Sequence, residues 1–166
     1  MPSITVSIKN NTDSTIQLVK ALDGSNVRWR FPYAYFKIEK ISDTTYKARW
    51  YKRCGNYDAI KSADFIKIES GSSFNPYTPG SVYSDYTISD KRNFEREGKY
   101  RITFYYSTNE TDFKKWLGDY NGVNFYFDNK IVLKSERKEE YQKLLDLFTK
   151  VPKMDIVSNE LIIEIE

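Results

Sequence analysis

Between Gly98 and Tyr106 the chain alternates strictly between two sets of side chains. Tyr100, Ile102, Phe104 and Tyr106 fall on one face of an extended backbone, and Lys99, Arg101, Thr103 and Tyr105 fall on the other. A period of two residues is typical of a strand with one buried face, and β-branched and aromatic residues are those that strands prefer. The stretch therefore predicts a strand of a β-sandwich, around which the other elements pack.

Other short stretches with the same features, each bounded by turn residues, predict further strands. They lie near residues 3–9, 14–20, 33–40, 46–51, 65–68, 82–88 and 161–165. We expect these strands to form two packed antiparallel sheets in a mostly β fold. The side chains that we expect to be buried together are Trp50, Tyr100, Ile102, Phe104, Leu161 and Ile163.

Residues 111–151 break this pattern and predict a partly helical insertion before the last strand. Thr111 is placed to cap a short helix, and Ser135 is placed to cap a second one that ends before Pro152. The apolar residues at helical spacing are Phe113, Trp116 and Leu117 in the first helix and Tyr141, Leu144, Leu145 and Phe148 in the second. Insertions of this length are often functional. The chain shows no linker or repeat, so we expect residues 1–166 to form a single β-sandwich domain with the insertion 111–151.

The composition argues against several kinds of chemistry. The 166 residues include no histidine and one cysteine, Cys54. Histidine is the commonest general base and metal ligand, and a single cysteine forms neither an internal disulfide nor a multi-cysteine metal site. The seven glycines form no phosphate-binding loop. We therefore expect no enzymatic activity, no bound metal and no cofactor.

Charge and hydropathy restrict the partners and the compartment. The chain carries 26 Lys and Arg against 23 Asp and Glu, a net charge of +3 that requires neither nucleic acid nor an anionic membrane as a partner. No apolar run approaches the roughly 20 residues of a membrane span. The residues from Met1 to Val6 are typical of a strand rather than of a signal peptide. We expect a cytoplasmic protein, and the alternative is an exported one whose leader has been removed.

Two segments resemble known protein families. The segment Gly98-Lys99-Tyr100-Arg101-Ile102 resembles the start of the sixth strand of immunoglobulin-like domains, where a tyrosine closes a corner by bonding back to the backbone. Together with the run from Asp64 to Phe74, it is similar to a sandwich module of deuterolysin-type proteases, in their non-catalytic leading domain, and of intracellular proteinase inhibitors of bacilli. The resemblance implies an antiparallel immunoglobulin-like β-sandwich without catalytic residues. It also implies that the strand of Trp50 lies beside the strand of Tyr100.

Outward side chains of those two strands form a candidate binding surface. The pleat turns Arg49, Tyr51, Arg101 and Tyr105 away from the core. Arginine and tyrosine are enriched at interface hot spots. The alternative is an ordinary charge ladder, in which Arg101 faces a glutamate of the last strand.

Trp116 is a further candidate binding residue. An exposed tryptophan can anchor a peptide or stack on a sugar. The alternative is burial beneath the inserted helices, which its apolar neighbours at helical spacing favour.

Three functional hypotheses follow. The first is a non-enzymatic module that binds another protein, with an inhibitor or a toxin-neutralising (immunity-type) protein as a special case. The second is a carbohydrate-binding β-sandwich that uses exposed aromatic residues. The third is an enzyme that uses only carboxylates and tyrosines.

Overall fold

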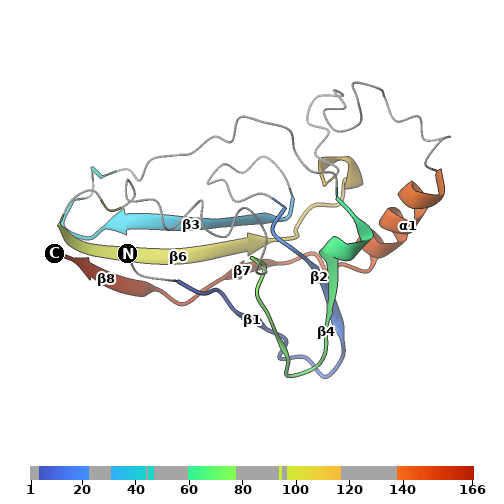
Figure 1. The fold of residues 1–166 in the computed structure, drawn as a ribbon, viewed down its shortest axis with the longest axis horizontal. Helices are drawn as coiled ribbons and strands as arrows, with labels where there is room; N and C mark the ends of the chain where they lie inside the picture. The colour runs from blue at the N-terminus through green and yellow to red at the C-terminus, as the bar shows by residue number, and fades with distance from the viewer. Residues whose placement is uncertain are drawn as a thin grey trace.

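The computed structural model describes residues 4–22, 31–43, 45–46, 60–77, 94, 97–116 and 138–166. In this part of the chain the fold is mostly β, with antiparallel strands and one α-helix (Figure 1). The strands are β1 (Ile8–Lys9), β2 (Ile16–Val19), β3 (Tyr33–Lys40), β4 (Phe65–Ile68), β5 (Ser73–Phe74), β6 (Gly98–Ser107), β7 (Asp155–Val157) and β8 (Leu161–Ile165). The helix α1 spans Lys138–Thr149, and η1 (Ser62–Asp64) and η3 (Phe113–Lys115) are short 3-10 helices.

The predicted strand around Tyr100 is the central strand, β6, of the longest sheet. The whole length of β3 pairs with one edge of β6, from Tyr33 opposite Ser107 to Lys40 opposite Tyr100. β7 and β8 share the other edge. Between β7 and β8, Ser158 donates its N–H to the Phe104 carbonyl oxygen, and its Oγ accepts from the Phe104 N–H, both at 2.9 Å.

The neighbour that we expected for β6 is wrong. Both edges of β6 are occupied by β3, β7 and β8, so the place that we assigned to the strand of Trp50 is taken by β3. The alternating pattern of a strand determines which side chains share a face, and leaves open which strand lies beside it. Residues 47–59, which include Trp50, and the predicted strand near 82–88 lie outside the described residues.

Gly98 starts β6 in a conformation that other residues rarely adopt. Its φ is +135°, and a Cβ at this position would lie 2.9 Å from Cε of Lys40. Glycine adopts positive φ without a steric penalty. The glycine therefore allows β6 to enter the sheet close beside the end of β3.

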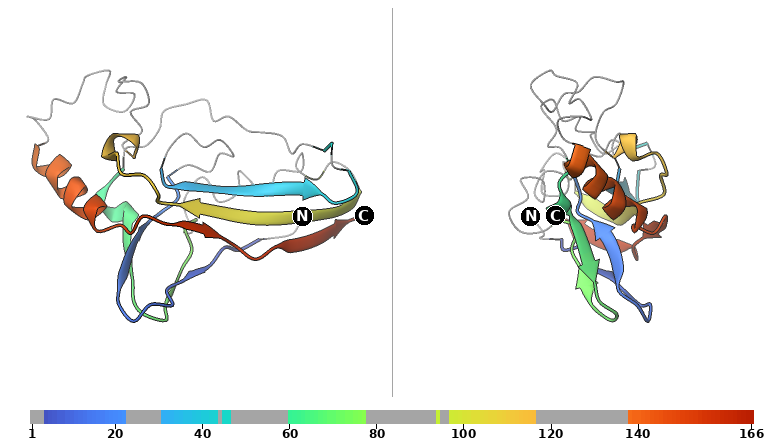
Figure 2. Two further views of the ribbon diagram at one scale, coloured as in Figure 1. Left: turned by 180° about the vertical axis from the view of Figure 1, so that it is seen from behind. Right: turned by 90° about the vertical axis from the view of Figure 1, so that its right-hand side faces the viewer.

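Two short strand pairs stand at one end of the long sheet. β2 pairs with β4, from Ile16 opposite Ile68 to Val19 opposite Phe65, and β1 pairs with β5. Figures 1 and 2 show β2 and β4 running away from the long sheet near the end of β6, with α1 beyond them.

The buried side chain of Asn10 joins the turn after β1 to the end of β4. Its Nδ2 donates to the carbonyl oxygens of Ser14 (2.8 Å) and Ile68 (2.9 Å), and its Oδ1 accepts from the N–H and hydroxyl of Thr12. The Asn10 side chain is thus fully hydrogen-bonded, as a buried amide must be.

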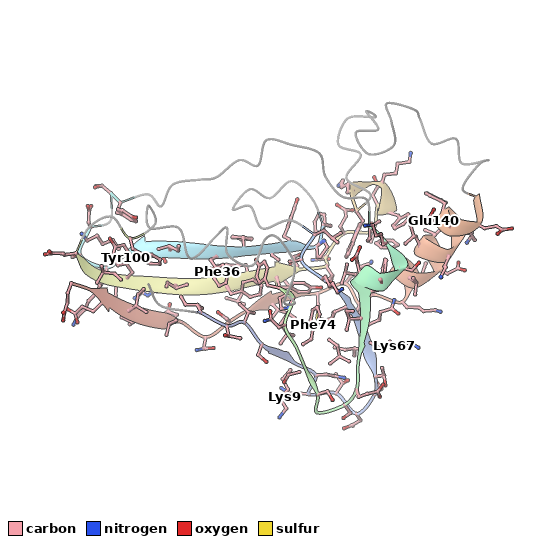
Figure 3. All side chains as sticks on the ribbon, viewed as in Figure 1. Lys9, Phe36, Lys67, Phe74, Tyr100 and Glu140 are labelled. Carbon is pink, nitrogen blue, oxygen red and sulfur yellow. The ribbon has the colours of Figure 1, made fainter. Side chains whose placement is uncertain are left out.

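The main core lies on the inner face of the long sheet. Tyr100, Ile102 and Phe104 are at most 3% exposed and pack with Phe36 of β3 and with apolar residues of β1, β2, β4 and β5. Figure 3 shows Phe36 and Tyr100 along this sheet and Phe74 near the short strand pairs. The predicted burial of the even-numbered residues of β6 is confirmed.

One predicted core residue is exposed. Leu161 is 40% exposed because it begins β8, at the edge of the sheet, whereas Ile163 is partly buried against the core.

The strand β7, between α1 and β8, was not predicted. Its three residues are too few to show an alternating pattern.

A second apolar cluster packs α1 and η3 against the end of the β2–β4 pair. Leu144 and Phe148 of α1 contact this cluster, and α1 ends three residues before Pro152, close to the predicted end. The η3 helix forms where a short helix was expected, but its cap is Asp112, whose side chain accepts from the Lys114 N–H at 3.0 Å. Ser135 lies outside the described residues.

Candidate functional site

The outer surface of the long sheet, here called the sheet face, brings together tyrosine, aliphatic and charged side chains. Strand register places Tyr35 of β3 opposite Tyr105 of β6, and Tyr105 opposite Val157 of β7. Four residues away along β6, Arg101 lies opposite Ile162 of β8. The sheet face is defined here by Tyr35, Lys37, Glu39, Arg101, Tyr105, Val157 and Ile162. Thr103, opposite Lys37, lies on the same face but is 6% exposed.

Aromatic and aliphatic side chains dominate one row of this face. The rings of Tyr35 and Tyr105 stack with centroids 5.1 Å apart and planes 9° apart. Val157 and Ile162 are each 56% exposed, although both are large aliphatic residues. Exposed aliphatic residues that gather beside aromatic ones are typical of a surface that another molecule covers.

The charged side chains of the sheet are mostly paired with one another. Nζ of Lys37 lies 2.8 Å from Oε1 of Glu39, and this hydrogen bond raises the pKa of Lys37, against the opposing effect of burial. Nζ of Lys99 lies 3.7 Å from Oε2 of Glu164. These exposed pairs contribute little to stability.

Arg101 forms an ion pair with Glu160, but without a well-aligned hydrogen bond from its Nε. Its Nε lies 3.1 Å from Oε2 of Glu160, but this buried nitrogen has no aligned hydrogen-bond acceptor. The contact is therefore electrostatic and matches the charge ladder that we considered as the alternative. A guanidinium has five N–H donors in all, so the pair with Glu160 leaves Arg101 with capacity to bind a further carboxylate.

The structure brings together two of the predicted binding residues. Arg101 and Tyr105 lie on the same face of β6, as predicted, and both are half-buried. Arg49 and Tyr51 lie outside the described residues. The structure adds Tyr35, Val157 and Ile162, which the choice of neighbouring strand had left out. Tyr35 and Ile162 could have been found from the alternation within 33–40 and 161–165.

Trp116 is buried and therefore does not form an exposed binding surface. Its side chain is fully covered, stacks with Phe31 (ring centroids 5.9 Å apart) and meets Phe148 edge to face (5.2 Å). Its indole N–H donates to the carbonyl oxygen of Glu110 at 3.3 Å, and Nζ of Lys153 lies 5.1 Å from the ring centroid. The alternative of burial beside the helices is the one that holds.

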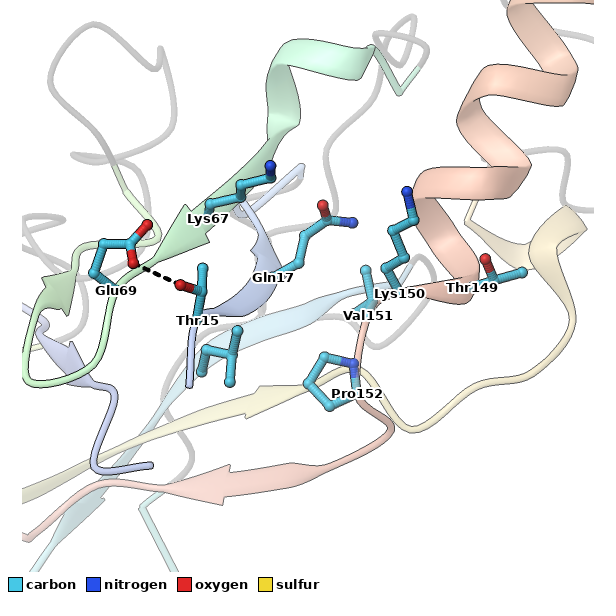
Figure 4. A pocket seen from close by; sticks show the side chains of 9 residues that line it. Thr15, Gln17, Lys67, Glu69, Thr149, Lys150, Val151 and Pro152 are labelled. Atoms are coloured by element: carbon cyan, nitrogen blue, oxygen red, sulfur yellow. Dashed lines mark hydrogen bonds between the residues drawn. The ribbon is translucent and has the colours of Figure 1, made fainter. Parts of the chain in front are cut away.

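A groove lies between the β2–β4 pair and the C-terminal end of α1. Its volume is about 500 Å³, and its polar lining residues are Thr15, Gln17, Lys67, Glu69, Thr149 and Lys150 (Figure 4). We did not predict this groove, because its residues come from three segments far apart in the sequence.

The described residues contain no group of three or more cysteine, aspartate or glutamate side chains placed to hold a metal ion. Within the same residues no helix is both long enough and apolar enough to cross a membrane.

Comparisons of the chain with protein-family models, with curated proteins and with solved structures gave no match.

Proposed function

We propose that the chain is a non-enzymatic protein-binding module and that the sheet face is its binding surface. The observation that carries the proposal is the row of Tyr35, Tyr105 and Val157, with Arg101 and the exposed Ile162 farther along the same face of the sheet. Tyrosine and arginine are enriched at interface hot spots, where they lie among apolar contacts that exclude water. An inhibitor of an enzyme and a toxin-neutralising (immunity-type) protein are special cases, since both act by binding alone.

The charges of the sheet face indicate the chemistry of the partner. Lys37 is paired with Glu39, so the middle of the face adds no net charge. Arg101 is the arginine of this face, and its Nε, 3.1 Å from Oε2 of Glu160, has no aligned acceptor among the residues that the structure describes. The matching partner is a protein surface that presents an apolar patch with a carboxylate at its side.

A carbohydrate ligand is the weaker alternative. Sugars stack on the open face of an aromatic ring, and each ring of the Tyr35–Tyr105 pair covers one face of the other. The stacking reduces the ring area that a sugar could contact. Apolar contact through Val157 and Ile162 also favours a protein, because a sugar exposes hydroxyl groups on most sides.

For the fold we propose an immunoglobulin-like β-sandwich, with β3 in the position that we had assigned to the strand of Trp50. The support is the order of strands, since β6 lies between β3 and the last strand, as the sixth strand of such domains lies between the third and the seventh. An experimental structure without a second sheet across Tyr100 and Phe104 would contradict this proposal.

The test of function begins with the tagged chain as bait in an extract of its native source, with bound proteins identified by mass spectrometry. The purified partner is then titrated by calorimetry with the double variant Tyr105→Ala, Val157→Asp. We expect its affinity to fall at least about tenfold, as for loss of hot-spot contacts. The affinity of the unchanged chain should also decrease with salt, because Arg101 is partly exposed.

The matched control is Gln142→Ala, Lys143→Ala, which changes two exposed residues of α1 away from the sheet face. It should bind as the unchanged chain does. Both double variants should stay within about 1 kcal/mol of the original stability. If the sheet-face variant also binds normally, the sheet face is not the binding surface. Binding on a glycan array that Tyr105→Ala abolishes would favour the carbohydrate alternative.

A further inference from the structure

The floor of the groove is the outer face of the β2–β4 pair. Gln17 of β2 lies directly opposite Lys67 of β4, so their side chains emerge on the same face. Figure 4 shows the amide of Gln17 between the side chains of Lys67 and Lys150. Lys150 follows the last residue of α1, and two strands and a helix end therefore meet around one amide group.

The hydrogen bond of Gln17 determines how its amide is oriented. Gln17 is 7% exposed, and its Nε2 donates to the carbonyl oxygen of Leu147, in α1, at 2.6 Å. A carbonyl oxygen accepts only, so the bonded atom is the amide nitrogen and the other atom is the oxygen. That Oε1 is left as an acceptor for a hydroxyl or N–H group of a ligand.

The groove is cationic near Gln17. Neither Lys67 nor Lys150 forms an ion pair with any other residue that the structure describes. The carboxylate among the lining residues, Glu69, accepts from the hydroxyl of Thr15 at 2.5 Å. Figure 4 shows this pair at the opposite end of the groove from Lys150. Two ammonium groups around one buried amide favour an anionic group, as lysines do in phosphate and carboxylate sites.

The remaining lining is apolar except for Thr149, whose hydroxyl donates to the carbonyl oxygen of Asp146 at 2.8 Å. Ile16, Val151 and Pro152 form part of the wall. A volume of about 500 Å³ lies within the usual range of small-molecule sites, which combine an apolar lining with a few polar groups that orient the ligand.

From this geometry we infer that the groove binds a small organic anion. Its carboxylate or phosphate group lies between Lys67 and Lys150, a neighbouring hydroxyl or N–H donates to Oε1 of Gln17, and its apolar body contacts Val151 and Pro152. This site is independent of the proposed function, because none of its residues belongs to the sheet face.

The inference is tested by calorimetric titration of the full chain with hexanoate, hexyl phosphate, 2-hydroxyhexanoate and the neutral hexanamide. We expect saturable binding of hexanoate or hexyl phosphate, and the tighter of the two identifies the anionic group. 2-Hydroxyhexanoate should bind more tightly than hexanoate, because its hydroxyl can donate to Gln17. Hexanamide should bind at least about tenfold more weakly than hexanoate, since it carries no charge.

The diagnostic variant is Lys67→Gln, Lys150→Gln, which should weaken binding of the anion roughly tenfold. The control variant Lys9→Gln, Lys143→Gln removes the same charge from exposed positions outside the groove and should bind as the original chain does. Three results would each overturn the inference: no binding of either anion, hexanamide binding as tightly as the tighter of the two anions, or normal binding by Lys67→Gln, Lys150→Gln. Inorganic phosphate that binds as tightly as hexyl phosphate would overturn the role of the apolar wall.

Discussion

At the scale of single residues, the hydroxyl of Tyr106 links β6 to β2 by two hydrogen bonds to the backbone of Val19. It donates to the carbonyl oxygen of Val19 at 2.8 Å and accepts from the Val19 N–H at 3.1 Å. One oxygen atom therefore satisfies both backbone groups of a fully buried residue in another sheet. Val19 would otherwise leave two buried polar groups unpaired, which is costly.

Tyr106→Phe should lower the free energy of unfolding by about 1–3 kcal/mol, the usual cost of leaving a buried hydrogen-bonding group unpaired. Denaturant titration followed by circular dichroism measures the loss. The control is Tyr105→Phe, the next residue of β6, which is half-buried on the sheet face. Equal stability of the two variants would mean that the Tyr106 hydroxyl does not bond to Val19.

The same hydroxyl predicts a stability that depends on alkaline pH. Burial raises the pKa of Tyr106 far above its ordinary value of 10.0, against the smaller effect of its hydrogen bond to Val19. The unfolded chain therefore loses this proton at a lower pH than the folded chain. Tyr106 contributes its full stability below about pH 10, and this contribution falls by up to about 1.4 kcal/mol per pH unit above it. Between pH 10 and 12, Tyr106→Phe should lose less stability than the original chain, and a parallel loss would contradict this.

Phe104 tests the assignment of the buried face of β6. Its ring is 3% exposed and lies 5.1 Å from that of Phe36 and 5.8 Å from that of Tyr77, between ring centroids. Phe104→Ala should cost roughly 3–5 kcal/mol of unfolding free energy, as for other buried aromatic residues. Tyr105→Ala, which changes the opposite face, should cost less than about 1 kcal/mol. Similar losses for the two variants would mean that the faces are wrongly assigned.

At the scale of elements, Asn10 holds two turns together with a single buried side chain. Asn10→Ala removes the donors to Ser14 and Ile68 and the acceptor for Thr12. We expect a loss of about 1–3 kcal/mol in thermal or chemical unfolding, because the buried carbonyl oxygen of Ile68 loses its side-chain donor. Asn11→Ala changes the exposed neighbour and should be nearly neutral. If both variants unfold alike, the hydrogen bonds of Asn10 do not hold these turns.

The sequence predicted individual strands better than their arrangement. The alternation within 33–40 and 98–106 matches β3 and β6 almost to the residue, because each strand has one buried face and turn residues at its ends. Pairing could not be predicted, because alternation is the same whichever strand lies beside it. For this reason β3 was not recognised as the neighbour of β6.

The sequence predicted residues that share a face of one strand, but not residues that come together from different elements. Arg101 and Tyr105 share a strand, so their common face follows from the pleat alone. Gln17, Lys67 and Lys150 come from β2, β4 and the end of α1, and no local pattern connects them. Trp116 could be assigned to the core or to the surface only after its packing against Phe31 and Phe148 was known.

At the scale of the whole molecule, each strand pairing in the described part of the chain joins distant segments. The pair of Val19 with Phe65 joins residues 46 positions apart, and that of Gly98 with Ile165 joins residues 67 positions apart. None of these pairings is a hairpin, so a long loop must close before any of them can form. Loop closure costs entropy before the contacts compensate for it, and folds of this kind form in milliseconds to seconds rather than in microseconds.

Stopped-flow refolding followed by tryptophan fluorescence should therefore show a main phase in the range of about milliseconds to seconds. We expect the β3–β6 pairing to belong to the folding nucleus, so Phe36→Ala or Phe104→Ala should slow this phase. Leu145→Ala in α1 should mainly speed unfolding. A microsecond main phase would show that local structure directs folding. With a slow main phase, by contrast, a newly made chain would spend that interval with both edges of β6 unpaired and open to other chains.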